Sequence, residues 1–108
     1  MEDSSQNPPL QTPTEEDKFP VKALPTIDRY MKIYGKSCDG NDRKGAGLFK
    51  EYEPADQLQR LVRELHAVRT NKAPEALCER IIGKSRKSKY ESYSRWATMM
   101  IGAINKRG

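Results

Sequence analysis

The sequence predicts a small all-α domain, a bundle of about four helices over residues 24–108 that follows a disordered N-terminal tail at residues 1–23. Apolar residues recur at helical spacing in several segments, whereas no segment of convincing length alternates as a strand does. Prolines precede and glycines follow several of these segments, as they do at helix ends. At 108 residues the chain forms one domain at most.

Residues 1–23 are predicted to be an acidic, proline-rich tail. They carry few apolar side chains, so burial cannot offset the entropy lost on ordering. A passive solubilising leader is favoured over a short linear motif. Between residues 1 and 19 the net charge is −4, because one base, Lys18, faces five acids: Glu2, Asp3, Glu15, Glu16 and Asp17.

The first helix is predicted to begin at Pro25–Thr26, with Thr26 as its N-cap, and to end at Gly35. Its apolar residues fall at i, i+3, i+4 and i+7 and share one face: Ile27, Tyr30, Met31 and Tyr34. Segment 36–47 is polar, contains three glycines and is predicted to be a loop. Residues 48–52 fit a short helix and an extended segment equally well.

Two more regular helices follow. The second begins at Pro54 and ends at Thr70–Asn71, with a stripe of core residues: Leu58, Leu61, Val62, Leu65 and Val68. The third begins at Pro74–Glu75 and ends at Gly83, and its apolar face consists of Leu77, Cys78, Ile81 and Ile82. The short link between them predicts that these two helices are neighbours in space.

The last helix is predicted over residues 88–106, after a basic turn at 84–89. Ser88 and Glu91 have the spacing of a capping box. At 100° per residue one face of this helix collects Tyr90, Tyr93, Ala97, Met100, Ile101 and Ile104.

A second apolar strip, Trp96, Met99 and Ala103, lies beside that face and widens the apolar arc. A small bundle does not normally cover so wide an arc from one side. Either the helix is central, with neighbours on two sides, or this Trp96 flank meets a partner.

Segments that resemble a phosphate-binding or calcium-binding loop lack the residues that these motifs require at fixed positions. The Gly-Lys-Ser tripeptides at 35–37 and 83–85 lack the earlier glycine and the preceding strand of a phosphate-binding loop. The segment that begins at Asp39 places bases where a calcium loop needs oxygen ligands. No pair of carboxylates stands out as an acid and a base.

Cysteine and histidine are too few and too scattered for a structural zinc site. Cys78 lies on an apolar face and is predicted to be an inert buried thiol, whereas Cys38 is placed in the polar loop beside Asp39. His66 borders the core stripe of the second helix, as a structural histidine does. We therefore expect no enzyme activity, no metal and no cofactor.

Charge gives the strongest functional indication. The chain after residue 19 carries +9, and from Arg80 onward eight Lys and Arg residues face a single acid, Glu91. Such a gradient favours an anionic partner at the C-terminal end: nucleic acid (RNA or DNA), an acidic protein surface or anionic lipid.

Two functions are therefore weighed. The first is a small nucleic-acid-binding or nucleoprotein-accessory module with a basic surface made of Arg80, Lys84, Arg86, Lys87, Lys89 and Arg95, with Tyr90 and Trp96 available for base stacking if exposed. The alternative is a protein-interaction module that binds a partner helix or a second copy of itself through Trp96, Met99 and Ala103.

Neither a signal peptide nor an apolar run long enough to span a bilayer is present in the sequence. The expectation is a protein of the cytoplasm, or of the nucleus in a eukaryotic or viral setting, with reduced thiols.

Overall fold

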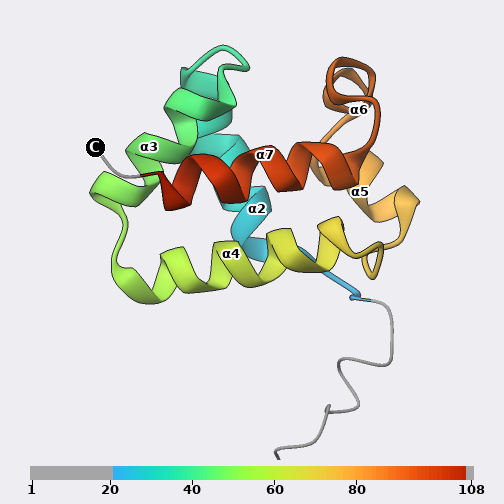
Figure 1. Cartoon of the computed structure of the whole chain (residues 1–108), viewed down its shortest axis with the longest axis horizontal. Coiled ribbons are helices and arrows are strands. Elements are labelled where there is room, and N and C mark those ends of the chain that lie inside the picture. The colour runs from blue at the N-terminus through green and yellow to red at the C-terminus, as the bar shows by residue number, and fades with distance from the viewer. Residues whose placement is uncertain (1–20, 107–108) are drawn as a thin grey trace, which may run out of the picture.

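The computed structural model describes residues 21–106, and within this range all regular structure is helical (Figure 1). The all-α class is confirmed for these residues, while most of the predicted tail, residues 1–20, lies outside them. In chain order the elements are α2 (Pro25–Tyr30), the π-helical turn η1 (Met31–Gly35), α3 (Asp42–Tyr52), α4 (Ala55–Arg69), α5 (Glu75–Ile81), α6 (Lys84–Tyr90) and α7 (Tyr93–Asn105).

The expected number of about four helices is wrong. Helix α3 begins inside the segment predicted to be a polar loop, and it also settles residues 48–52 as helical. Helix α6 occupies the segment predicted to be a basic turn. The predicted helices after Pro54 and after Pro74 are confirmed as α4 and α5.

Helices α4 and α7 form the centre of the fold, where they lie side by side and run in opposite directions (Figure 1). Helix α2 packs against α4, and α3 packs against α7. Near the start of both helices, Asp42 of α3 accepts a hydrogen bond from Trp96 of α7. Near their ends, the Lys50 ammonium of α3 donates to the carbonyl of Lys106, which follows α7. Helix α3 therefore runs along α7 in the same direction.

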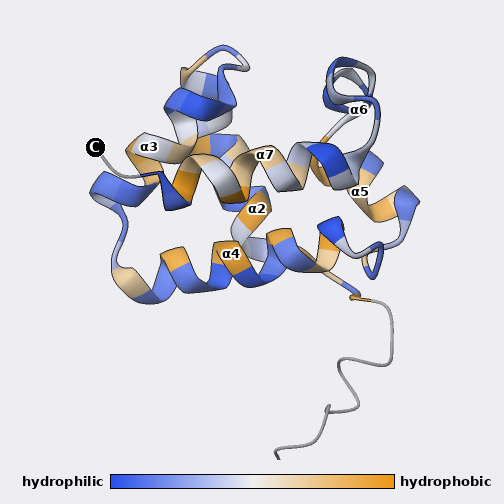
Figure 2. Ribbon diagram, viewed as in Figure 1, coloured by the Kyte–Doolittle hydropathy of each residue, from blue (hydrophilic) through white to orange (hydrophobic). Residues whose placement is uncertain are grey.

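The hydrophobic core lies between these helices. Figure 2 shows apolar residues on the side of α4 that faces α7, with polar residues on its outer side. The predicted stripe of α4 is confirmed at Leu61, Leu65 and Val68, which are buried, while Leu58 and Val62 are half-buried at its edge. The other large, fully buried apolar side chains come from α2 with its N-cap residue, from α3 and from α7: Leu24, Ile27, Tyr30, Phe49, Trp96 and Met100.

The start of α2 is capped from another helix. The predicted N-cap, Thr26, is instead the second residue of α2, and its own N–H needs an acceptor. Glu64 of α4 supplies this acceptor, with carboxylate oxygens 2.9 Å from the Thr26 nitrogen and 2.8 Å from the Ile27 nitrogen. A carboxylate also suits the positive end of the helix dipole. Gly35 does not end the helix, which continues through η1 into residues 36–37.

Helix α3 begins at a local cap. The Asn41 side chain accepts a hydrogen bond from the Lys44 N–H at 3.3 Å, so Asn41 is the N-cap and Asp42 the first helical residue. Gly45, one turn later, faces the Tyr30 ring so closely that a Cβ there would overlap the Tyr30 hydroxyl. The glycine thus allows α2 and α3 to approach each other at this point.

The junction of α6 and α7 differs from the predicted capping box. Ser88 lies inside α6, and Glu91 adopts a left-handed conformation (φ 77°) that ends this helix. The N-cap of α7 is Ser92, which accepts a hydrogen bond from the Arg95 N–H at 3.0 Å. Gly83, with φ 101°, separates α5 from α6, so positive-φ residues bound α6 on both sides.

Across residues 21–106, none of the helices combines the length and apolar character that crossing a bilayer requires.

Candidate nucleic-acid interface

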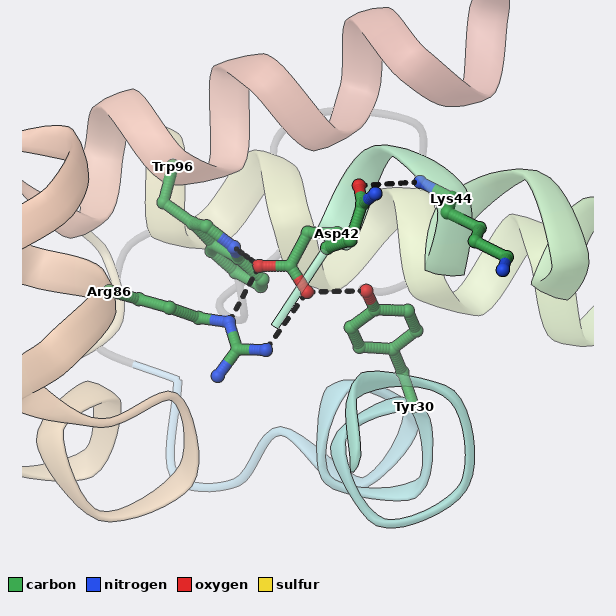
Figure 3. Close-up of polar contacts among 6 residues, drawn as sticks. Tyr30, Asp42, Lys44, Arg86 and Trp96 are labelled. Carbon is green, nitrogen blue, oxygen red and sulfur yellow. Dashed lines mark hydrogen bonds and ion pairs between the residues drawn. The ribbon is translucent and has the colours of Figure 1, made fainter. Parts of the chain in front are cut away.

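A buried carboxylate, Asp42, lies where α2, α3, α6 and α7 meet (Figure 3). Its residue is 1% exposed. Oδ1 accepts hydrogen bonds from the Tyr30 hydroxyl at 2.6 Å and from Arg86 Nη2 at 2.9 Å. Oδ2 accepts from Arg86 Nε at 2.6 Å and from Trp96 Nε1 at 2.8 Å. Four donor groups on three side chains therefore satisfy one buried anion.

These contacts keep Asp42 ionised. Burial by itself would raise the pKa of Asp42, but the hydrogen bonds from Arg86, Tyr30 and Trp96 outweigh it and hold that pKa below its usual range. The pKa of Tyr30 is strongly raised, first by burial and then by its bond to Asp42, so the phenol stays protonated as a donor. The hydrogen bond to Asp42 raises the pKa of Arg86, in spite of burial. The centre is thus a structural ion pair, and its carboxylate is too weakly basic to serve as a general base near neutral pH.

Arg86, one of the bases predicted to contact nucleic acid, is held by Asp42 in the structure. Its side chain is 17% exposed, and its guanidinium holds Asp42 in a bidentate pair. Only the third nitrogen, Nη1, points away from Asp42 (Figure 3). Releasing Arg86 to a phosphate would leave a buried carboxylate without its counter-ion, which is far more costly than breaking a surface pair.

Of the two alternatives for the Trp96 flank, the structure shows the central helix, because α7 has α4 on one side and α3 on another. The Trp96 side chain is fully buried, and its indole N–H donates to Asp42. Met99 and Ala103 are half-buried and pack against the core. The reason is α3, which covers this side of α7 and which sequence periodicity did not reveal. The apolar flank therefore meets a neighbour within the same chain, and the protein-interaction hypothesis loses its principal residue.

The other five predicted bases lie at the surface, around the point where α5, α6 and the start of α7 meet: Arg80, Lys84, Lys87, Lys89 and Arg95. We call this set the basic corner. Their residues are exposed except for Lys87, which is half-buried.

Two ion pairs connect α6 to α5 within the basic corner. Lys87 binds Glu75 at 2.8 Å, and Lys84 lies 3.9 Å from Glu79. Arg95 binds Glu91 at 2.6 Å, with both side chains more than 70% exposed. Arg80 and Lys89 form no ion pair with any residue in the range 21–106.

Helix α6 separates its bases by direction. Arg86 is directed inward to Asp42, and Tyr90, one turn later, is half-buried against the core. The opposite side carries Lys84, Lys87 and Ser88, which line a surface hollow together with Glu79 and Glu91. Within the seven residues of α6, one base, Arg86, therefore points into the protein, and the lysines lie at its surface.

The aromatic rings near the basic corner are buried or partly covered. The Lys89 ammonium lies 5.4 Å from the centre of the Tyr90 ring, and Lys87 lies 5.9 Å from the centre of the buried Tyr93 ring. With Trp96 buried as well, none of these three rings is an open platform for a base.

The two cysteines and the single histidine were the other residues considered for chemistry. Cys78 is buried as predicted, and burial raises the pKa of its thiol. Cys38 lies in the turn before α3, within the segment predicted to be a loop, and is also buried. His66 is exposed, and its Nδ1 lies 3.3 Å from Arg69 Nε. In the part of the chain that the structure describes, no cluster of three or more His, Cys, Asp or Glu side chains could hold a metal ion.

Two structural residues went unrecognised in the sequence. Asp42 stood in a segment tested only as a calcium loop, although Asn41–Asp42 is a reasonable helix start. For Glu64, no local sequence signal indicates that it caps α2 across 38 residues. Comparison of the chain with protein-family models, with curated proteins and with solved structures finds no match.

Proposed function

We propose that the chain is a small, non-enzymatic nucleic-acid-binding module that contacts the phosphate backbone through the basic corner. One observation carries the proposal: besides Arg86, α5, α6 and the first turn of α7 together carry five bases, of which four are exposed and one, Lys87, is half-buried. Lys and Arg side chains at such density neutralise phosphates and release the counter-ions of nucleic acid, which drives binding.

The acids at this corner do not prevent such binding. Glu75, Glu79 and Glu91 each pair with one base, which leaves a net charge of +2 among the eight side chains. Exposed pairs of this kind contribute only ~0–1 kcal/mol, so a phosphate can replace the acid at small cost. The excess charge is modest, and the affinity is therefore expected to be modest and sensitive to salt.

Recognition should depend on the backbone more than on the bases. The aromatic rings near the corner are buried or covered, so base stacking has little support, and a phosphate contact carries no sequence information. The module should therefore bind RNA and DNA of different sequences with similar affinity.

The test is fluorescence anisotropy with labelled single-stranded RNA and duplex DNA. Four to five phosphate contacts predict that affinity falls ~10²–10³-fold between about 50 and 200 mM salt. Absence of binding at the lower salt concentration, or an affinity that does not change with salt concentration, would contradict the proposal.

A matched pair of variants locates the surface. Lys84→Gln with Lys89→Gln removes two bases from the corner and should lower affinity and reduce the salt slope by about 2. Arg60→Gln with Arg63→Gln removes the same charge from the exposed side of α4 and should change binding much less. Equal losses in the two variants would show that net charge alone, and not the corner, is responsible.

A further inference from the structure

The N-terminal segment joins the domain beside the basic corner. Val21 packs against the core, and its N–H donates to the carbonyl of Lys72, in the link between α4 and α5, at 2.9 Å. In Figure 1 the blue start of the described chain lies near the end of α4, on the same side of the molecule as α5 and α6. Val21, the first residue that the structure describes, is thus held beside the link between α4 and α5.

Two further bases connect this attachment point with the corner. The carbonyl of Arg69, in the last turn of α4, accepts a hydrogen bond from the Ser94 hydroxyl of α7 at 2.7 Å. Ser94 precedes Arg95, a member of the basic corner, and Lys72 follows three residues after Arg69. Arg69 and Lys72 are exposed, and neither pairs with an acid within residues 21–106. Positive side chains thus extend from the corner to the place where the chain enters the domain.

The segment before Val21 carries the complementary charge. Glu15, Glu16 and Asp17 are consecutive acids, four to six residues from Val21. A chain spans at most ~3.3–3.6 Å per residue, so these three carboxylates stay within roughly 20 Å of the Val21 anchor. The covalent link also keeps them at an effective concentration on the order of millimolar beside Arg69 and Lys72.

We propose that the acidic triad Glu15–Glu16–Asp17 docks on the exposed bases around Lys72 and the basic corner, and so competes with nucleic acid for them. The competition rests on the proposed function, whereas the docking does not. Each exposed pair contributes only a few tenths of a kcal/mol, so three pairs reduce the affinity for nucleic acid about three- to tenfold. The segment therefore tunes binding and does not abolish it.

Zero-length carbodiimide cross-linking of the full chain tests the docking. We expect the triad to form amide links with Lys72, Lys84, Lys87 or Lys89 more often than with Lys32, Lys44 or Lys50, which belong to η1 and α3. Links to Lys22 are ignored, because it is too near in sequence. An even distribution over all exposed lysines would overturn the docking.

Charge substitutions in the full chain test the competition. Glu15→Gln, Glu16→Gln and Asp17→Asn together should raise affinity for labelled RNA at low salt about three- to tenfold. Asp39→Asn, Glu51→Gln and Asp56→Asn remove the same charge from exposed acids of the domain and should have a smaller effect. Equal gains in the two triple variants would overturn the competition. If no protein binds RNA, the proposed function fails, and the cross-links still decide the docking.

Discussion

Two arginines in this protein hold a carboxylate at the same distance and yet differ in what they do. Arg86 binds Asp42 at 2.6 Å with a fully buried carboxylate, and Arg95 binds Glu91 at 2.6 Å with both side chains more than 70% exposed. The first pair joins α6 to α3 and cannot be released without leaving a charge in the core. The second is screened by water and salt and is available to another anion. Burial, more than residue type, therefore separates the arginine that holds the fold together from the one that is free to bind another anion.

The largest effect is expected from Arg86→Met, which keeps most of the apolar stem but removes the counter-ion of Asp42. An uncompensated buried charge should cost ~3–5 kcal/mol, a large share of the ~5–15 kcal/mol by which domains are usually stable. Urea unfolding followed by circular dichroism measures this loss. A loss below about 1 kcal/mol would mean that the Asp42 centre behaves like a surface pair.

The second largest change in stability is expected from a substitution at the contact between α2 and α3. Gly45→Ala places a methyl group against the Tyr30 hydroxyl that binds Asp42 and should destabilise by ~1–3 kcal/mol. Gly47→Ala is the control on the same helix, where a Cβ meets nothing within 4 Å, and it should stabilise by ~0.5–1 kcal/mol. If both alanine substitutions destabilise the protein, or both stabilise it, the close approach of α2 and α3 at Gly45 is contradicted.

Acid pH should weaken the same centre gradually. Because the folded-state pKa of Asp42 is below its unfolded value of ~3.9, its contribution to stability is present above that value and is lost as pH falls through the folded pKa. Trp96 is the only tryptophan, and its indole N–H donates to Asp42, so its NMR resonance reports the titration. The resonance should shift only below pH ~4. A midpoint at or above that pH would show that Asp42 is not held ionised.

The smallest effect on stability is expected from Arg95→Met, the same substitution as in the buried pair. Loss of an exposed i,i+4 pair should cost at most ~0.3–0.5 kcal/mol in the urea experiment. The variant should nevertheless bind RNA more weakly than wild type, because Arg95 belongs to the basic corner. A stability loss near that of Arg86→Met would erase the distinction between the two arginines.

Local sequence patterns were sufficient for the elements whose signals are local. The apolar stripe and Pro54 predicted α4, and Pro74 with Gly83 predicted α5. In each case the helical spacing of the apolar residues and the residues typical of helix ends indicate the same segment. Segments with few apolar residues were misjudged. Helix α3 contains two glycines, and α6 buries none of its residues fully, so neither shows a clear stripe.

The sequence by itself determined the helical class, the positions of α4 and α5, and the concentration of bases after Arg80. Only the tertiary structure decided which of those bases are free, because Asp42 lies 44 residues from Arg86 and 54 from Trp96. No local pattern records a hydrogen bond over such a separation. Once α3 is folded against α7, burial makes Arg86 and Trp96 partners of one carboxylate, and the basic corner is what remains at the surface.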